Sequence, residues 1–308
     1  MMKKCPLFSV CGGCKYDFSA PDYRAKKQEN IKQWNFSAEP FWGAVGGRRR
    51  VDLCFGDGEL GFFQRGTKNI VPVQKCPLLV DEINQVLPEL AKLPWNGAGS
   101  ALVTLCDNGL DMAVNSNVPY FSKEFKNLVS KLGFLRVTWN GTTVIQTEQP
   151  KITFKNKTVD YVSGAFLQPT CESEDAIRNL VLDKAAGAKH IVDLFCGLGN
   201  FTFALGAEGF DIVGTGVKRD LFKKPLSAKT LNNYDCVVMD PPRAGALEQC
   251  REIAKSNVPR MIYVSCNPNT FKRDADILMK SGYKMLELYA FDQFVGSEHW
   301  EFVSVFEK

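Results

Sequence analysis

Hydrophobic and polar positions follow one pattern in the first 170 residues of the chain and another in the remainder. In the first part, short apolar runs flank turn sequences, which is typical of antiparallel hairpins. This pattern predicts an α+β region with an antiparallel sheet. The turn sequences are Gly56-Asp57-Gly58, Asn108-Gly109, Asn140-Gly141 and Lys155-Asn156-Lys157.

Helices are predicted before and between these strands. The segment 19–22 has the composition of a helix start, and the polar residues 23–34 after it predict a mostly exposed helix. Apolar residues at helical spacing predict two more helices, over residues 81–93 and 122–132.

From about residue 172, helix and strand signals alternate, as in a parallel doubly wound sheet. A helix over residues 172–186 precedes the apolar strand 191–195, and the glycine-rich Cys196-Gly197-Leu198-Gly199-Asn200 opens the next helix. The fold class is therefore α/β, with a Rossmann-like domain preceded by the α+β region. We expect three parts. Residues 1–80 hold an N-terminal cysteine loop and the start of the central α+β domain, residues 81–170 hold the remainder of that domain, and residues 171–308 form the Rossmann-like domain.

Composition agrees with a globular protein, since 45% of the residues are hydrophobic and 23% are charged. The net charge of +4 is too small to indicate a nucleic-acid partner by itself. No apolar run reaches the roughly 18 residues of a membrane helix, and the lysines at positions 3 and 4 lead into no apolar signal segment. We therefore expect a cytoplasmic protein without a membrane partner.

The chain has 11 cysteines, an odd number that disulfides cannot pair completely. Cys5, Cys11 and Cys14 form C-x5-C-G-G-C, and Cys76 lies far downstream in Lys-Cys-Pro. Three thiolates from one loop and a fourth from elsewhere are typical of an iron–sulfur cluster. A four-cysteine zinc site and unliganded buried thiols remain open as alternatives. The other cysteines outside the strand ends are expected to be packing residues: Cys54, Cys106, Cys171, Cys236 and Cys250.

Polar residues follow three predicted strands at their carboxyl ends. These are the glycine loop, Asp240-Pro241-Pro242-Arg243, and Cys266-Asn267-Pro268. Carboxyl ends of parallel strands share one edge of the sheet, where open α/β folds bind cofactors. The glycine loop alone is weak evidence for a cofactor site, since G-x-G also occurs in dinucleotide folds and in plain tight turns. Cys266 is a candidate nucleophile, with a packing residue at the strand end as the alternative.

These segments resemble the RNA uracil-C5 methyltransferases that use S-adenosylmethionine, and within them the iron–sulfur branch that modifies 23S ribosomal RNA. The resemblance covers nearly the whole chain. The segments that carry it are Cys5 to Cys14 with Cys76, Phe166-Leu-Gln168, Asp193-Leu-Phe-Cys-Gly-Leu-Gly-Asn200-Phe, Asp240-Pro-Pro-Arg-Ala-Gly245, Ser265-Cys266-Asn267-Pro268 and His299-Trp300-Glu301.

The resemblance implies the chemistry. Carbon 5 of uracil is not nucleophilic, so the Cys266 thiolate would add to carbon 6, and carbon 5 would then take the methyl group. Glu301 would remove the carbon 5 proton, unless it is only a solvated carboxylate. Asp240 would hold the uracil edge with Arg243 and border the cofactor. The other residues implied to contact S-adenosylmethionine are Gln168, Phe195 and Asn200, and those implied to hold a 4Fe-4S cluster are Cys5, Cys11, Cys14 and Cys76.

The chain departs from the family in two places. We expect it to be without the N-terminal barrel domain of the family's larger members, and residues 215–235 are too few for two crossovers of about 10–12 residues each and a strand. We therefore expect the cofactor domain to lack a helix and a strand. The family has an acid after its second strand, where this sequence offers Gly214-Thr215-Gly216 instead. That difference predicts weaker binding of the cofactor ribose.

The expected partner is RNA, with ribosomal RNA favoured over transfer RNA because of the cysteine motif, and the protein is expected to be a monomer. Arg48-Arg49-Arg50, near Phe41 and Trp42, fits a phosphate grip and a solvated basic turn equally well. Two alternatives to an active uracil methyltransferase remain. One is an iron–sulfur RNA-binding protein that has lost methyl transfer, and the other is a zinc-containing methyltransferase acting on another base.

Overall fold

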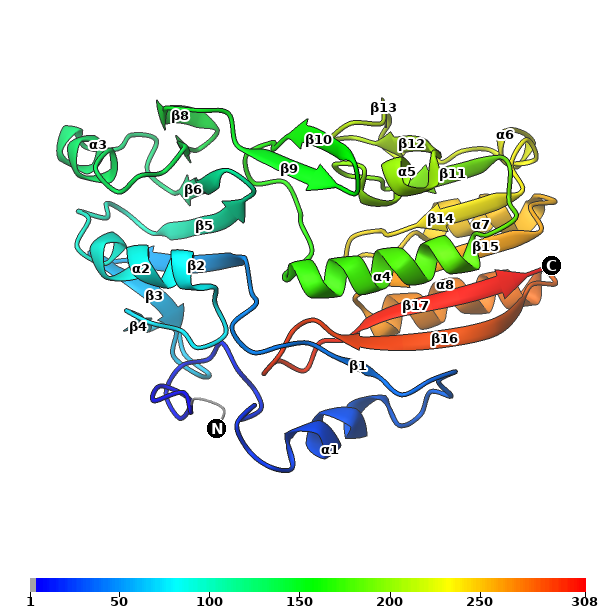
Figure 1. Cartoon of the computed structure of the whole chain (residues 1–308), viewed down its shortest axis with the longest axis horizontal. Helices are drawn as coiled ribbons and strands as arrows, with labels where there is room; N and C mark the ends of the chain where they lie inside the picture. The colour runs from blue at the N-terminus through cyan, green and yellow to red at the C-terminus, as the bar shows by residue number, and fades with distance from the viewer. Residues whose placement is uncertain (1–3) are drawn as a thin grey trace.

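The structure is a computed structural model that describes residues 4–308, and two β-sheets divide it into two halves (Figure 1). The first sheet lies in the half drawn blue to green, and the second lies in the half drawn green to red. The N-terminal segment, drawn dark blue, lies at the bottom of this view. Helix α4 (Cys171–Lys184) begins the passage to the second sheet, close to where the sequence pattern changes.

The first sheet has seven strands in the order β4-β3-β2-β5-β6-β7-β8. All neighbours are antiparallel except β6 and β7, which are parallel because the crossover through α3 joins them. The elements of this half are β2 (Arg50–Gly56), β3 (Glu59–Phe63), β4 (Ile70–Pro72), α2 (Asp81–Leu90), β5 (Gly99–Cys106), β6 (Gly109–Ser116), α3 (Lys123–Val129), β7 (Arg136–Trp139) and β8 (Thr142–Gln146), followed by a separate hairpin of β9 (Lys151–Phe154) and β10 (Lys157–Asp160).

The predicted turns are confirmed at all four places, since each lies between two paired antiparallel strands. Asp57, Asn140 and Lys155 adopt positive φ angles of 52°, 48° and 55°, the conformation that tight hairpin turns require. The helices predicted over residues 81–93 and 122–132 are also confirmed, each slightly shorter than expected.

The second sheet has eight strands in the order β1-β16-β17-β15-β14-β11-β12-β13. Strand β17 runs antiparallel to both its neighbours, and every other pair is parallel. The elements of this half, besides α4, are α1 (Tyr23–Gln28), η1 (Glu29–Ile31), β1 (Phe41–Trp42), β11 (Ile191–Leu194), α5 (Asn200–Leu205), β12 (Glu208–Asp211), β13 (Val217–Lys218), α6 (Ala228–Leu231), β14 (Cys236–Met239), α7 (Leu247–Lys255), β15 (Arg260–Ser265), α8 (Pro268–Lys280), β16 (Lys284–Asp292) and β17 (Glu301–Glu307).

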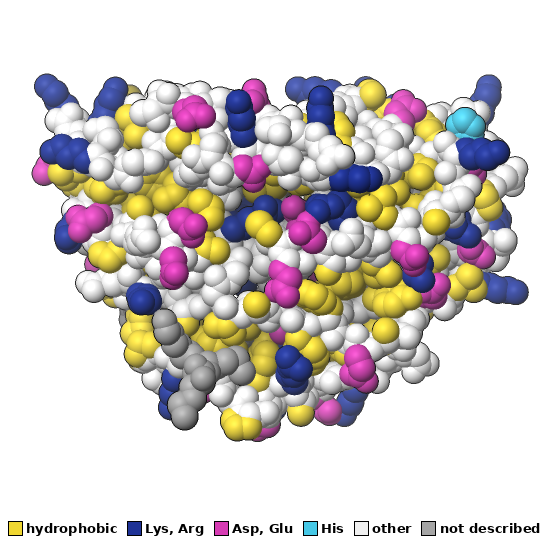
Figure 2. Space-filling view, viewed as in Figure 1, with side chains coloured by type: hydrophobic (Ala, Val, Ile, Leu, Met, Phe, Trp, Pro, Cys, Tyr) yellow, Lys and Arg dark blue, Asp and Glu magenta, His cyan; other side chains and the backbone are white. Residues whose placement is uncertain are grey.

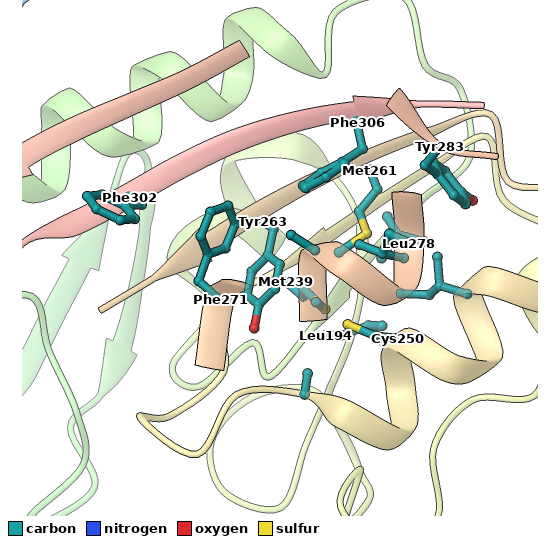
Figure 3. Packing of buried hydrophobic residues seen from close by; sticks show 14 of the residues in the cluster. Leu194, Met239, Cys250, Met261, Tyr263, Phe271, Leu278, Tyr283, Phe302 and Phe306 are labelled. Atoms are coloured by element: carbon teal, nitrogen blue, oxygen red, sulfur yellow. The ribbon is translucent and has the colours of Figure 1, made fainter. Parts of the chain in front are cut away.

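The central strands of this sheet are apolar throughout because helices cover both faces. In β14, Val237 and Met239 join the apolar cluster of α7 and α8, whereas Cys236 and Val238 join the cluster of α4 and α5. Figure 3 shows the first cluster, with the ring of Phe271 beside that of Tyr263. This double burial fixes the sheet as a rigid platform for the residues at its carboxyl edge.

The connection between β12 and β13 is short, as the sequence predicted. Residues 212–216, all of them described, contain no helix. The expectation that a strand would also be missing is wrong, because β13 retains two residues that pair with β12. The short connection needs a glycine at position 214. Gly214 has a φ of 108° and contacts the glycine loop so closely that a Cβ there would lie 1.9 Å from the Gly197 carbonyl oxygen.

The N-terminal helix packs against the second sheet through buried polar groups. The expected exposed helix over residues 23–34 is shorter, and its Lys27 is completely buried. The Lys27 ammonium forms an ion pair with the buried Asp292 at the end of β16, and the Tyr23 hydroxyl donates to the same carboxylate at 2.6 Å. Strand β1 then pairs with β16. The segment 23–42 is thus part of the second sheet's structure.

Replacing Lys27 with methionine should destabilise the protein strongly, because Asp292 would remain buried without its partner. We expect a loss of about 3–5 kcal/mol in the free energy of unfolding, measured by urea denaturation. The matched control is Lys26→Met on the same helix, whose ion pair with Asp22 is exposed and should contribute less than about 1 kcal/mol. Equal losses for the two variants would contradict the assigned role of the buried pair.

Candidate functional site

The carboxyl ends of β11, β14 and β15 open into one cavity of about 490 Å³. The cavity lies where the glycine loop, the Asp240 segment and the Cys266 segment meet, as the sequence pattern predicted. The connection from β10 to α4 and the start of β17 complete its wall. All six residues expected to act in catalysis or cofactor contact line it: Gln168, Phe195, Asn200, Asp240, Cys266 and Glu301.

The glycine loop places backbone against the cavity. Gly199 caps α5 at a φ of 97°, and a Cβ there would lie 2.4 Å from the Phe203 ring. Phe195 has a positive φ of 62°, which is uncommon outside glycine. Its ring packs against Phe222 at a centroid distance of 5.3 Å. The loop therefore presents an aromatic surface next to free space.

Two predicted cofactor residues are held by polar contacts. The Gln168 amide nitrogen donates to Asp240 at 3.2 Å, and its amide oxygen is buried without a hydrogen-bond partner in the described part of the chain. Asn200 accepts a hydrogen bond of 2.8 Å from Arg178. Burial raises the pKa of the Asp240 carboxyl. The wall therefore offers an unpaired amide oxygen and a carboxyl group to a ligand.

The acid that seemed to be missing after the second strand is present. Strand β12 ends at Asp211 rather than near Gly214, so the expected replacement by Gly214-Thr215-Gly216 is wrong. The Asp211 carboxylate lines the cavity but accepts from the backbone N–H of Gly197 at 2.8 Å and from that of Ile212 at 2.6 Å. The short connection thus engages this carboxylate in its own backbone.

Cys266 and Glu301 lie at the other end of the same cavity. Burial, followed by the charges of Glu301 and Asp240, raises the pKa of the Cys266 thiol to about 12. Glu301 is only 2% exposed, and burial together with Asp240 raises its pKa well above the usual value. One of its carboxylate oxygens accepts a hydrogen bond of 2.5 Å from Gln293, and the other has no partner among the described residues.

Sequence reasoning missed Gln293 and the packing of Phe222. Gln293 follows β16 without any motif of its own and bonds to Glu301 without itself lining the cavity, and Phe222 becomes a neighbour of Phe195 only through the short connection. Asp220, which follows that connection, does line the cavity, and its carboxylate accepts from the backbone N–H of Phe222 at 3.1 Å. His299 also lines the cavity, and burial, followed by the Arg243 charge, lowers its pKa.

The arginine run does not form one basic surface. Arg49 is buried and pairs with Glu174 at 2.6 Å, while its Nε donates to the Gln168 carbonyl oxygen. Neither a phosphate grip nor a solvated turn describes it, because it fixes the segment that carries Gln168. Arg50 instead lies over the ring of Phe166, a cavity residue that is 60% exposed. That pair leaves an aromatic face open to a flat ligand.

The N-terminal cysteines converge on one apolar cluster. Cys5, Cys14 and Cys76 pack around Phe18, Leu78 and their neighbours. Burial, and then the charges of Cys76 and Cys11, raises the pKa of Cys14 to about 12. Within residues 4–308, no three His, Cys, Asp or Glu side chains are arranged to hold a metal ion.

The cysteines expected to be packing residues differ in exposure. Cys106, Cys236 and Cys250 are buried, in agreement with that prediction, and Cys54 is half-buried. For Cys171 the prediction is wrong, because this thiol is exposed in the first turn of α4.

The surface does not by itself identify a partner. Figure 2 shows Lys and Arg side chains interspersed with Asp and Glu on this face of the molecule, without one continuous basic region. None of the described helices has the length and apolar character needed to cross a membrane.

Comparison with solved structures identifies the class of fold. The tRNA (uracil-54, C5)-methyltransferase of Pyrococcus abyssi, solved in complex with S-adenosyl-L-homocysteine, superimposes with a TM-score of 0.72. The match covers 92% of this chain and 81% of the other, at 18% sequence identity. The fold is therefore that of a Rossmann-like methyltransferase.

Sequence comparison identifies the family. A family model described as tRNA (Uracil-5-)-methyltransferase matches residues 217–308, which carry Asp240, Cys266 and Glu301. An uncharacterized RNA methyltransferase of Caulobacter vibrioides is 33% identical over 99% of this chain and 85% of its own length. Another, from Rhizobium meliloti, is 35% identical over 97% of this chain and 82% of its own length. The chain belongs to the RNA uracil-C5 methyltransferase family, and it is a transferase.

Proposed function

We propose that the protein methylates carbon 5 of a uridine in RNA with S-adenosylmethionine, using Cys266 as the nucleophile and Glu301 as the base. The observation that carries this proposal is the single cavity in which a thiol and a buried carboxylate lie beside an aromatic and polar pocket. Thiolate addition to carbon 6 is needed because carbon 5 alone cannot attack a methyl group.

The cavity residues fit the proposed cofactor. S-adenosylmethionine would supply an electrophilic methyl group on a positively charged sulfonium. Phe195 and Phe222 offer aromatic surface for its purine, and the unpaired Gln168 amide oxygen and the Asp240 carboxyl group suit its cationic groups. Gln168, Phe195, Asn200 and Asp240 would hold it.

Cys266 would start the reaction. With a pKa of about 12 the thiol is protonated at rest, so its proton must leave as sulfur bonds to carbon 6. Asp240 and Glu301 both raise this pKa by their charge and line the same cavity, so these two carboxylates are the candidate acceptors of the proton. The electron pair of the 5,6 double bond then moves into the uracil ring as an enolate, whose carbon 5 takes the methyl group.

Glu301 would finish the reaction. Its carboxylate takes the proton from carbon 5, the 5,6 double bond forms again, and the bond between Cys266 and carbon 6 breaks. Burial favours this role because a raised pKa makes the carboxylate a stronger base. The oxygen that Gln293 does not engage would receive the proton.

The direct test is incubation of the protein with methyl-labelled S-adenosylmethionine and uridine-containing RNA, followed by nucleoside analysis. The proposal expects label in 5-methyluridine. Label only in other nucleosides would contradict it.

The short connection between β12 and β13 supports a second candidate, an RNA-binding protein that has lost methyl transfer. The Asp211 carboxylate is engaged by backbone N–H groups and is not free to bind a ribose. The Caulobacter alignment extends over 360 residues, whereas this chain has 308, so the relative holds residues that have no counterpart here. Calorimetry separates the candidates: S-adenosylmethionine binding at micromolar concentration favours the enzyme, and RNA binding without it favours the second.

We further propose that Cys5, Cys11, Cys14 and Cys76 hold a 4Fe-4S cluster. Three of these soft thiol donors, Cys5, Cys14 and Cys76, lie on one apolar cluster, and Cys11 belongs to the same short loop as Cys5 and Cys14, which suits iron–sulfur ligation. The thiolates would repel one another, as the raised pKa of Cys14 indicates, and a bound cation would remove that cost.

Anaerobically purified protein should be brown and contain about four iron atoms per chain. In Cys14→Ser the colour and the iron should fall to background, whereas the exposed Cys171→Ser should retain both. Iron quantification and visible absorption measure this. A colourless protein containing one zinc ion would contradict the cluster and favour the four-cysteine zinc site.

We propose 23S ribosomal RNA as the substrate rather than transfer RNA, because the cysteine motif resembles that of the ribosomal branch. Mass spectrometry of 5-methyluridine in RNA from cells with and without the protein tests this choice. Loss of the modification from transfer RNA alone would overturn it.

A further inference from the structure

Gln293 makes a contact with the proposed base that no sequence motif indicates. Its side-chain amide donates to one oxygen of Glu301 at 2.5 Å, and both residues are at most 2% exposed. No other described side chain donates a hydrogen bond to Glu301. The orientation of the carboxylate in the cavity therefore depends on this one amide.

The backbone on both sides of Gln293 is held by the N-terminal helix. Lys27 pairs with the side chain of Asp292, the residue before it, and also donates to the carbonyl oxygen of Phe294, the residue after it, at 3.0 Å. The Tyr23 hydroxyl donates to Asp292 and accepts from the Gly296 backbone N–H at 3.0 Å. We refer to Tyr23, Lys27 and Asp292 as the buried clamp.

We propose that Gln293 is a positioning residue for Glu301, fixing the carboxylate so that its free oxygen points at carbon 5 of the uracil, and that the buried clamp holds Gln293 in place. This inference rests on the proposed function of Glu301. It assigns the N-terminal helix a part in catalysis, although that helix contributes no residue to the cavity wall.

The role predicts a specific kinetic defect. Only the last step, in which Glu301 removes the carbon 5 proton, needs the carboxylate fixed. If that step slows, the methylated uracil stays bonded to Cys266 and a covalent enzyme–RNA adduct accumulates. Loss of one hydrogen bond to a charged group corresponds to a slowing of about 10- to 100-fold.

The pH dependence of the same step should also change. Burial and then Asp240 raise the pKa of Glu301, while the Gln293 hydrogen bond lowers it, and the other titratable or charged side chains at this end of the cavity include Cys266, Arg243 and His299. Removing the amide therefore raises the pKa further. Because the base acts only when deprotonated, the pH midpoint of adduct resolution should move upward.

The test uses Gln293→Met, which keeps the side-chain length without the donor, and Gln293→Asn, which keeps the amide but is too short to reach. Single-turnover reactions with RNA and S-adenosylmethionine are resolved on denaturing gels at several pH values. We expect both variants to form adduct at the wild-type rate and to resolve it about 10- to 100-fold more slowly.

The matched control is Gln249→Met, because Gln249 is equally buried but bonds only to the backbone of Leu226. It should lose stability without accumulating adduct. Adduct resolution at the wild-type rate and pH midpoint in both Gln293 variants, or the same accumulation in Gln249→Met, overturns the inference. If the wild-type protein itself neither labels RNA nor forms adduct, the proposed function fails instead.

Discussion

Cys266→Ala should reduce methyl transfer to RNA by at least about 10³-fold, into the background of a labelled-methyl assay. Without the thiol nothing adds to carbon 6, and carbon 5 does not become nucleophilic. The side chain is half-buried and lines the cavity rather than the apolar core. The variant should therefore bind S-adenosylmethionine and unfold in urea much as the wild-type protein does.

Cys171→Ala is the control for this experiment, because Cys171 is exposed and outside the cavity. It should retain wild-type activity. Full methylation by Cys266→Ala would exclude the nucleophilic mechanism. Loss of activity in both variants would instead point to a general requirement for thiols.

Glu301→Gln should separate the two halves of the reaction. Replacing the carboxylate removes one of the negative charges that raise the pKa of Cys266, so addition and methyl transfer should proceed. Proton removal from carbon 5 should slow by about 10²- to 10⁴-fold. We expect one methyl group transferred per protein and a covalent RNA adduct that persists on denaturing gels.

The control is Glu307→Gln, on the same strand but at its other end, where Glu307 pairs with Arg260 at 2.8 Å. It should turn over normally and leave no adduct. A Glu301→Gln variant that turns over at the wild-type rate would remove Glu301 from the role of base. A variant that forms no adduct and transfers no methyl group would assign Glu301 to the first step instead.

The sequence allowed the architecture to be predicted wherever local pattern decides it. The turns at Asp57, Asn140 and Lys155 need positive φ angles, and the apolar β14 needs a sheet covered on both faces, so both could be inferred from residue type alone. The fold around residues 212–216 could not, because it depends on Gly214 touching a loop that precedes it by 17 positions. The predicted loss of the strand failed for that reason.

Of the candidate site, only the residues that directly follow a strand could be predicted from the local sequence pattern. Asp240 and Cys266 follow apolar runs, and parallel strands bring such residues to one edge. Gln293 and the buried clamp were not predictable. Lys27 lies in a polar segment, which indicates an exposed side chain, and only its ion pair with Asp292 on a distant strand allows it to be buried. Side chains that act through long-range pairs carry no local signal.

The contacts of the buried clamp span 265 and 269 positions of the chain. During synthesis, residues 23–27 leave the ribosome long before Asp292 is made. Lys27 therefore stays exposed to solvent, without its partner, until the last two strands have been synthesised. The first sheet can fold from neighbouring segments in the meantime. Catalytic competence should therefore appear abruptly at release of the completed chain, and a newly made protein lacking β16 and β17 would have a nucleophile without a base.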